Sequence, residues 1–414
     1  EIIKKIIKNL CYPLSPYQFD VIEPEILGRI YERFLASKIR LTEKHLAKVE
    51  EKPEVRKAGG VYYTPQYIVD YIVENTVGEK IKGFTPAEIE KIKIVDPACG
   101  SGSFLLGAYQ YLIKYHKNWY SKNKNFLKKY KDDFYITYDE EIQLTTEKKG
   151  NILKNNIYGV DIDQQATEVA IMSLYLKLLD EGFDKGETLL FLKGRVLPDL
   201  TTNIKCGNSL IGSDFYSNQD ILLFEKVELK KVNTMDWDKA FPAIFQNGGF
   251  DVVIGNPPYV NAKTLVELFG PERNYLSNSK NYQTLFQKWD LYIAFIEKSI
   301  NIVKPFGLIS MIIPYPFINQ MYAKILRKYI IENYNLISIA DLSNIKVFKE
   351  AVVTNCIFII EKLKPARSVK ILRIENENFK SYLTKNYSDL IIDKDSYVWD
   401  LNKCKGRKQK EIEK

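Results

Sequence analysis

Histidine and cysteine are scarce in this sequence of 414 residues. The two histidines, His45 and His116, lie in charged, helix-like stretches, so a Ser-His-Asp triad, a His-rich zinc site and an H-E-x-x-H helix are excluded. The five cysteines are far apart and include no C-x-x-C pair, which argues against a disulfide framework or a zinc ribbon and for a reducing compartment. We therefore expect a cytoplasmic protein without a metal site.

Long apolar runs are also missing. The best candidate, Leu308 to Ile318, contains Pro314 and Pro316 and falls short of the roughly 18 apolar residues that a membrane helix needs. We expect no membrane partner. The sequence begins at Glu1 without a Met or a signal-like segment, and we expect it to be a piece of a longer protein.

The residues that are abundant indicate a folded protein. Hydrophobic residues make up 45% and aromatic residues 13% of the chain, which is enough to build a large core. The 60 Lys and Arg residues exceed the 52 Asp and Glu residues, giving a net charge of +8. This modest excess is compatible with a polyanionic partner, and a lysine-rich solvated surface explains it equally well.

Short apolar runs alternate with longer amphipathic stretches from Lys91 onward. The pattern predicts strands at residues 92–95, 157–160, 250–254 and 308–313, and helices at 103–115, 166–174 and 292–303. Such alternation indicates an α/β fold with a mostly parallel sheet covered on both faces. Residues 117–150, with a lysine run, and the polar, loop-like residues 261–290 interrupt the alternation. We favour a solvated insertion over a nucleic-acid patch for the lysine run.

A glycine-containing loop follows the first predicted strand. Asp96 ends this strand, and the loop contains Gly100 and Gly102 before the next helix, where backbone N–H groups can approach a nucleotide-like ligand. Asp161 ends the next predicted strand and is suited to bind two ribose hydroxyls, with Ile162 beside it to pack on an adenine ring. Asp96 suits a cationic amine and would repel a pyrophosphate. The two acids therefore favour S-adenosylmethionine over NAD, although each aspartate alone could be a helix N-cap.

The strand at residues 250–254 runs into Asn256-Pro257-Pro258-Tyr259. The two prolines fix the backbone, so that the Asn256 amide oxygen and the Pro257 carbonyl can each accept one N–H of a planar amino group. The nitrogen lone pair is then free to attack a methyl group in line. Tyr259 offers a ring on which a base rotated out of a duplex can stack. Taken alone, the tetrapeptide could also be an ordinary turn.

Together these motifs resemble the amino-group DNA methyltransferases. The resemblance is closest to the adenine-N6 enzymes, especially the methyltransferase portion of type II (IIG-like) restriction-modification enzymes, and covers roughly residues 20 to 362. It implies a Rossmann-like, S-adenosylmethionine-dependent methyltransferase fold with a mostly parallel seven-stranded sheet, preceded by a helical segment. It also implies double-stranded DNA as a partner, and nuclease and target-recognition domains or subunits outside this sequence.

The resemblance also assigns further residues. The element at residues 59–65, with Tyr63 and Thr64, is similar to the family's motif for the methionine end of the cofactor, and Ala98 belongs to the glycine loop. Asn208 and Ser209 are similar to the element that reads the cofactor's adenine amino group, although Asn208 stands where Asp is frequent. The remaining implied contacts are Pro258 and Phe295 as walls of the adenine pocket and Phe348 against the extruded base.

We expect three regions: a helical N-terminal segment or connector at residues 1–58, the catalytic domain at 59–365, and the start of a truncated target-recognition region at 366–414. Pro198-Asp199 and Glu228-Leu229-Lys230 match a nuclease pattern, but we reject them because they lie between methyltransferase elements.

Other functions stay open on the sequence. Cytosine-N4 methylation uses the same geometry, although those enzymes more often have Ser in place of Asn256. Protein-glutamine or RNA-guanine methylation shares the tetrapeptide, and a non-catalytic DNA-binding scaffold remains an alternative from another class. Cys99 lies within the glycine loop, where we expect a packing residue and not a nucleophile.

Overall fold

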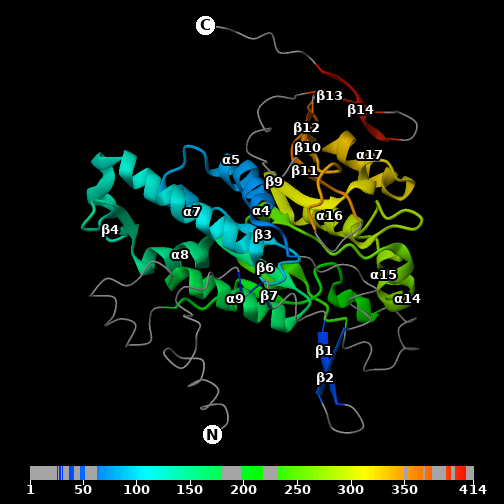
Figure 1. Ribbon diagram of the computed structural model, residues 1–414, viewed down its shortest axis with the longest axis horizontal. Coiled ribbons are helices and arrows are strands. Elements are labelled where there is room, and N and C mark those ends of the chain that lie inside the picture. The colour runs from blue at the N-terminus through cyan, green and yellow to red at the C-terminus, as the bar shows by residue number, and fades with distance from the viewer. Residues whose placement is uncertain are drawn as a thin grey trace.

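The computed structural model describes most of the chain, and its core is one large sheet with helices on both faces (Figure 1). The described residues are 26, 28, 30, 37–41, 47–51, 63–179, 197–217, 232–348, 353–366, 369–374, 388–392 and 397–406. The sheet has eight strands in the order β12-β10-β11-β9-β8-β3-β6-β7. Their bounds are β3 Ile94–Asp96, β6 Ile157–Asp161, β7 Ile204–Cys206, β8 Phe250–Gly255, β9 Val303–Pro314, β10 Asn335–Asp341, β11 Asn355–Glu361 and β12 Lys370–Arg373.

Most neighbouring strands are parallel, as the sequence predicts. The strands from β7 to β9 pair in parallel, whereas β11 runs antiparallel to both of its neighbours, β9 and β10. The expected number of seven strands is wrong by one, because β12 pairs in parallel with β10 at the edge. This strand has only four residues, with Lys370 and Arg373 at its ends, so it gives little signal in the sequence.

The helices surround this sheet. Their bounds are α4 Gln66–Val73, α5 Glu79–Ile81, α6 Pro86–Ile89, α7 Ser103–Lys122, α8 Thr146–Asn156, α9 Gln164–Leu179, α12 Trp237–Ala240, α13 Pro242–Gln246, α14 Ala262–Leu268, α15 Gly270–Asn278, α16 Leu291–Ile302 and α17 Lys324–Asn333. A π-helical turn, η2 (Glu74–Gly78), joins α4 to α5. Short 3-10 turns are η3 Lys124–Tyr130, η4 Ser213–Ser217, η6 Tyr315–Ile318 and η7 Met321–Ala323.

Successive residues of a strand point to opposite faces of the sheet, which divides the core into two layers. On β8, Val252 and Ile254 pack in one cluster with side chains of α4, α7, α8 and α9. Val253, between them, packs in a second cluster with side chains of α12, α13, α16 and α17. All six residues of β8 are buried, as expected for a central strand covered on both faces.

Part of the expected N-terminal helical segment is a hairpin. Ile26, Gly28 and Ile30 are helical, but β1 (Ser37–Leu41) and β2 (Ala47–Glu51) pair antiparallel, with Ile39 opposite Val49. The helical prediction is wrong for these two strands, where apolar and charged residues alternate with the period of a strand.

The two interruptions of the alternating pattern also contain regular structure. The second, at residues 261–290, was expected to be loop-like, but it contains α14 and α15, which begin after Asn261 as N-cap and at Gly270-Pro271. The first extends α7 and then forms a hairpin of β4 (Phe134–Ile136) and β5 (Ile142–Leu144).

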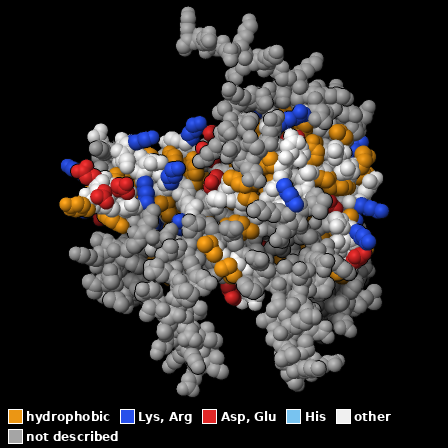
Figure 2. Space-filling model, in the orientation of Figure 1, with side chains coloured by type: hydrophobic (Ala, Val, Ile, Leu, Met, Phe, Trp, Pro, Cys, Tyr) orange, Lys and Arg blue, Asp and Glu red, His pale blue; other side chains and the backbone are white. Residues whose placement is uncertain are grey.

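The surface of the first insertion is mixed in charge. Its tip is exposed and acidic at residues 139–141, and Figure 2 shows red side chains beside orange ones at this end of the molecule. Lys148, at its base, is buried and pairs with Glu90 and Asp133 at 2.9 and 3.1 Å. An acidic tip favours the solvated insertion over a nucleic-acid patch, because DNA phosphates would repel it.

Beyond β12, the described residues form a further hairpin, in which β13 (Ser388–Ile392) pairs antiparallel with β14 (Trp399–Gly406). Trp399 is buried in the same core cluster as residues of α17. Among all the described helices, none is long and apolar enough to cross a membrane.

Candidate active site

The glycine loop lies at the carboxyl end of β3 and is tightly folded. Gly100 and Gly102 have φ angles of 52° and 92°, in the left-handed region that favours glycine. Gly102 is the N-cap of α7, and a Cβ atom there would lie 3.1 Å from Cβ of Ala170 on α9. The loop therefore needs glycine at residue 102 both for its turn and for helix packing.

Asp96 is buried below this loop with a relative exposure of 1%. Burial raises the pKa of its carboxyl group to about 8; the nearby Asp161 carboxylate adds to this rise, and the hydrogen bond from the Ala98 backbone N–H to Oδ1, at 2.9 Å, opposes it. Within the described part of the chain, no Lys or Arg pairs with Asp96. A buried carboxylate without a cationic partner is a fitting site for the ammonium group of a ligand.

Asp161, at the end of β6, connects to the glycine loop directly. Its Oδ2 accepts a hydrogen bond from the Gly100 N–H at 2.8 Å, and its Oδ1 accepts one from the Asp163 N–H at 2.9 Å. Burial raises the pKa of this carboxyl group, while these backbone N–H groups lower it. Ile162 beside it is 53% exposed, so its side chain is available to pack on a ligand ring.

Asn256 follows β8 directly, after the residue that lies against the buried acid. The backbone of Gly255 approaches Asp96 so closely that a Cβ atom would lie 2.6 Å from Asp96 Oδ1. The Asn256 side-chain Nδ2 donates to Thr64 Oγ1 at 3.2 Å. Its Oδ1 is buried and has no hydrogen-bond partner among the described residues. Buried acceptors are normally paired, so this oxygen is suited to accept an N–H from a bound substrate.

The rest of the tetrapeptide forms the floor of the site. Pro257 is buried and Pro258 is partly exposed. Tyr259 is 9% exposed, and its hydroxyl donates to the Ile312 carbonyl at 3.1 Å and accepts from Asn355 Nδ2 at 3.2 Å. Asn355 was not predicted as a site residue, although an Asn at the start of the apolar run of β11 is a signal that could have identified it.

Tyr259 and Phe348, the two expected base-stacking residues, lie together. Their ring centroids are 6.2 Å apart and the rings meet edge to face at 73°. Both side chains belong to the cluster on the α4 side of the sheet. The structure thus brings together two aromatic residues that are 89 positions apart in the sequence.

The expected adenine-binding element makes mainly internal contacts. Asn208 Oδ1 accepts from the Leu210 N–H at 3.0 Å and Nδ2 donates to the Val232 carbonyl at 3.2 Å. Ser209 Oγ donates to the Pro97 carbonyl at 2.5 Å, so it ties this element to the glycine loop. The Asn208 oxygen retains a second lone pair for a ligand.

A small apolar cluster joins four segments at this edge. Phe295 of α16 packs with Leu210, with Val260 in the loop after β8, and with Ala98 of the glycine loop. The expected pocket wall is therefore assembled from segments nearly 200 residues apart in sequence, as their numbers show. The Leu291 N–H donates to the Val260 carbonyl at 2.9 Å, which holds α16 against the loop after β8.

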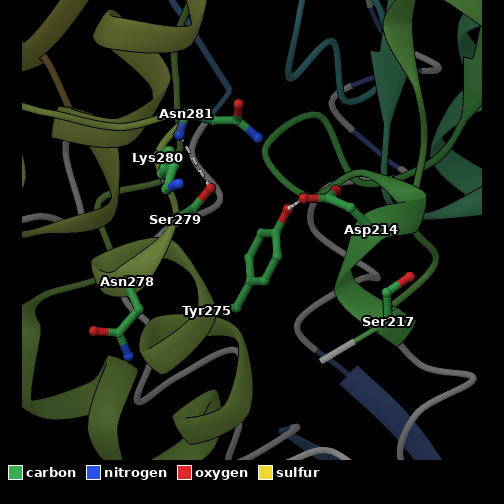
Figure 3. Close-up of a pocket in the computed structure, with 7 residues that line it drawn as sticks. All are labelled: Asp214, Ser217, Tyr275, Asn278, Ser279, Lys280 and Asn281. Atoms are coloured by element: carbon green, nitrogen blue, oxygen red, sulfur yellow. Dashed lines mark hydrogen bonds between the residues drawn. The ribbon is translucent and has the colours of Figure 1, made fainter. Parts of the chain in front are cut away.

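The pocket in Figure 3 is about 330 Å³ in volume, and Asn256 is not among the residues that line it. It is lined by η4 and by the end of α15 and the residues after it, and the Tyr275 hydroxyl donates to Asp214 Oδ2 at 2.7 Å across it. Tyr282 donates in turn to the Leu210 carbonyl at 2.7 Å. These bonds attach the α14–α15 insertion to the element that carries Asn208.

Of the upstream element, residues 59–62 lie outside the described residues, whereas Tyr63 and Thr64 precede α4. Thr64 is buried and contacts Asn256 as given above. Gly28, which the sequence did not single out, also approaches this region: a Cβ atom there would lie 2.9 Å from Ser101 Oγ and 3.8 Å from a ring carbon of Tyr63. The residues that Gly28 approaches are at least 35 positions later in the sequence, so no local sequence pattern identifies this glycine.

Cys99 is a packing residue, as expected. It is 5% exposed, burial raises the pKa of its thiol well above the ordinary value, and Gly159 leaves room for its sulfur. Across the described ranges, no three His, Cys, Asp or Glu side chains come together as a metal-ligand group.

The fold and the site define a Rossmann-like methyltransferase of the kind that modifies amino groups. Residues 155–348 match the family model for the Eco57I restriction-modification methylase, and residues 23–190 match the one for N-6 DNA methylase. Both models describe methylases, and together they match residues 23–348, so the chain is similar to the N6-adenine DNA methyltransferases of restriction-modification systems.

The relatives give the same picture. The chain is 34% identical over 402 residues to the type II restriction enzyme and methyltransferase RM.Eco57I of Escherichia coli, covering 96% of this chain and 36% of that protein. It is 24% identical over 335 residues to the type II methyltransferase M.BstVI of Geobacillus stearothermophilus, covering 80% of this chain and 47% of that protein. The chain thus spans well under two thirds of these relatives.

Solved structures share the fold. In the DrdV–DNA complex, 91% of this chain matches 33% of that chain with a TM-score of 0.54 and 14% identity. In the type IIL restriction-modification enzyme MmeI in complex with DNA, 86% of this chain matches 42% of that chain with a TM-score of 0.52 and 16% identity.

Proposed function

We propose that this chain transfers a methyl group from S-adenosylmethionine to the N6 amino group of an adenine rotated out of double-stranded DNA, as the methyltransferase part of a restriction-modification system. One observation carries the proposal: the Asn256 amide oxygen is buried and unpartnered among the described residues, directly after Gly255, whose backbone lies against the buried Asp96. The match of residues 23–190 to the N-6 DNA methylase model supports the choice of adenine over cytosine.

The residues around the glycine loop fit the cofactor. Asp96 would hold its ammonium group, Asp161 its ribose hydroxyls, and the exposed Ile162 its adenine ring. S-adenosylmethionine supplies an electrophilic methyl group when it is bound. S-adenosylmethionine has no phosphate, so neither acid would repel it.

The catalytic loop, Asn256 to Tyr259, acts by placing the target amine. The Asn256 oxygen and the Pro257 carbonyl each accept one N–H of the target amine, which draws the nitrogen lone pair out of the ring's conjugation and aims it at the methyl group. This chemistry needs no His, Cys or metal, in agreement with a sequence that is poor in His and Cys. The rigid anchors of Tyr259, at the Ile312 carbonyl and Asn355, support a fixed platform for the base.

The division of the chain into regions is also a proposal. We assign residues 59–365 to the catalytic domain, residues 1–58 to an N-terminal connector, and residues 366–414 to the start of a target-recognition region. Nuclease and recognition parts would be supplied outside this chain, since RM.Eco57I, described as both restriction enzyme and methyltransferase, is much longer than the segment that matches. The net charge of +8 suits a DNA backbone.

The test is methylation of duplex DNA by the full chain. We expect N6-methyladenine after incubation with S-adenosylmethionine and plasmid DNA, detected by nucleoside mass spectrometry. Asn256→Ala should abolish the product while the dissociation constant of S-adenosylmethionine, measured by calorimetry, changes less than about threefold, because Asn256 faces the target amine and not the cofactor. Product at the wild-type rate in this variant would refute the mechanism, and N4-methylcytosine in its place would refute the base.

A further inference from the structure

Thr64 and Asn256 meet inside the site although 192 positions separate them. Thr64 is 4% exposed, and its hydroxyl oxygen accepts a hydrogen bond from Asn256 Nδ2 at 3.2 Å. The sequence assigns Thr64 to the methionine end of the cofactor through its motif. The structure gives its hydroxyl another partner, namely the catalytic amide.

This bond holds the side-chain amide of Asn256 in place. The amide is planar, with an oxygen that accepts and a nitrogen that donates. Nδ2 is held by Thr64, and Oδ1 is buried without a partner among the described residues. The Thr64 hydroxyl can donate as well as accept, so it would pair with either end of the amide. The N–H donors of the target amine favour the arrangement in which Oδ1 faces them, because two donors repel each other.

Thr64 is itself held in place, so it can fix the position of the Asn256 side chain. It precedes Pro65, which restricts its backbone to extended conformations. Pro65 begins α4, whose Ile68 and Val69 are fully buried in the same cluster as Ile254 of β8. Strand β8 and helix α4, which carry the two partners, therefore move as one packed unit.

We infer that Thr64 is a positioning residue that holds the Asn256 side chain where its oxygen can accept from the target amine. The inference rests on the proposed function and deepens it, since it names what keeps the catalytic amide in place. Thr64 acts through Asn256 and touches no reacting atom.

The experiment compares three variants of the full chain. Thr64→Val removes the hydroxyl with almost no change of shape, Thr64→Ser keeps the hydroxyl, and Thr137→Val makes the same Thr-to-Val change on the distant β4–β5 hairpin. For each, we would measure the single-turnover rate of adenine methylation at saturating S-adenosylmethionine and DNA, the dissociation constant of S-adenosylmethionine, and the melting temperature.

We expect Thr64→Val to lower the single-turnover rate by about tenfold to a hundredfold, the scale of one lost hydrogen bond in a buried site. The dissociation constant of the cofactor should stay within about twofold, since the hydroxyl is assigned to Asn256. Thr64→Ser should restore the rate to within about threefold, and Thr137→Val should match the wild type. A change of stability alone would lower the melting temperature without this split between rate and affinity.

Two results would overturn the inference: a wild-type rate in Thr64→Val, or a weakened cofactor affinity with a normal rate at saturation, which would assign Thr64 to the cofactor. Thr64→Ala provides the same loss of hydroxyl if Thr64→Val does not fold. Asn256→Ala, measured in parallel, distinguishes a failure of this inference from a failure of the proposed mechanism. If Asn256→Ala is inactive and Thr64→Val is fully active, only this inference fails; if Asn256→Ala is active, the proposed mechanism fails.

Discussion

Asp96 carries an electrostatic cost in the ligand-free protein. Its carboxyl group has a pKa of about 8 because it is buried, so at neutral pH most molecules hold it protonated. A carboxyl group with a raised pKa in the folded state stabilises the fold fully at pH below its unfolded value, and this contribution is lost as the pH rises toward 8. A cationic ligand would favour the deprotonated form of Asp96, because its positive charge stabilises the carboxylate.

From this we predict a proton release. Binding of S-adenosylmethionine at pH 7 should release close to one proton, and the affinity should fall by up to about tenfold per unit as the pH drops from 8 to 6, since the proton must leave Asp96 before the ammonium pairs with it. Calorimetry in buffers of different ionisation enthalpy measures the released proton. Asp96→Asn is the control, and it should bind weakly and release none. Equal release in this variant would contradict the assignment.

The end of β8 shows what an element contributes to the site. β8 is the central strand that delivers Asn256, and Gly255 lets its backbone pass directly against the Asp96 carboxylate. A side chain at this position would separate the acid that we assign to the cofactor from the amide that we assign to the base. Glycine is therefore needed at residue 255 because the ends of β8 and β3 lie so close together there, and not because the chain turns.

We predict that Gly255→Ala destabilises the protein by about 1 to 3 kcal/mol, the range for overpacking a buried position. It should also weaken S-adenosylmethionine binding, because the new methyl group displaces Asp96. Denaturant unfolding and calorimetry measure the two effects. The matched control is Gly270→Ala at the start of α15, where a Cβ atom would have no neighbour within 4 Å. A Gly255→Ala variant as stable as Gly270→Ala would show that the strand end adjusts freely.

At the scale of the molecule, the site exists only in the folded chain. Its parts come from the segment before α4, from the ends of β3, β6 and β8, from the Asn208 element and from α16. An unfolded chain would therefore not bind the proposed cofactor with comparable affinity. Ligand binding and folding are linked, and the stability of the whole molecule becomes a measure of the assembled site.

We predict that S-adenosylmethionine at a hundred times its dissociation constant stabilises the fold by about 2.7 kcal/mol. The melting temperature of the whole chain should rise with the logarithm of cofactor concentration. NAD at the same concentration should leave it unchanged, because its pyrophosphate would face Asp96. Equal stabilisation by the two nucleotides would contradict the choice of cofactor made from the two acids.

Local patterns were enough for much of this molecule. The run of buried residues in β8 and the acids that end β3 and β6 are visible in the sequence, because a strand covered on both faces is apolar throughout and a ligand at its end requires polar side chains. The patterns failed for β12, which is short, and for α14 and α15, whose polar surfaces hide their buried residues Leu265 and Tyr275.

By itself, the sequence determined the parallel α/β fold, the order of the motifs and the chemical identity of Asn256 and its neighbours, because these depend on periodicity and on residues adjacent in the chain. Only the tertiary structure decided that Thr64 meets Asn256, that Gly255 lies against Asp96 and that Asn355 anchors Tyr259. Each of these contacts joins segments far apart in the chain, and their closeness follows from packing and strand order, which no local pattern encodes.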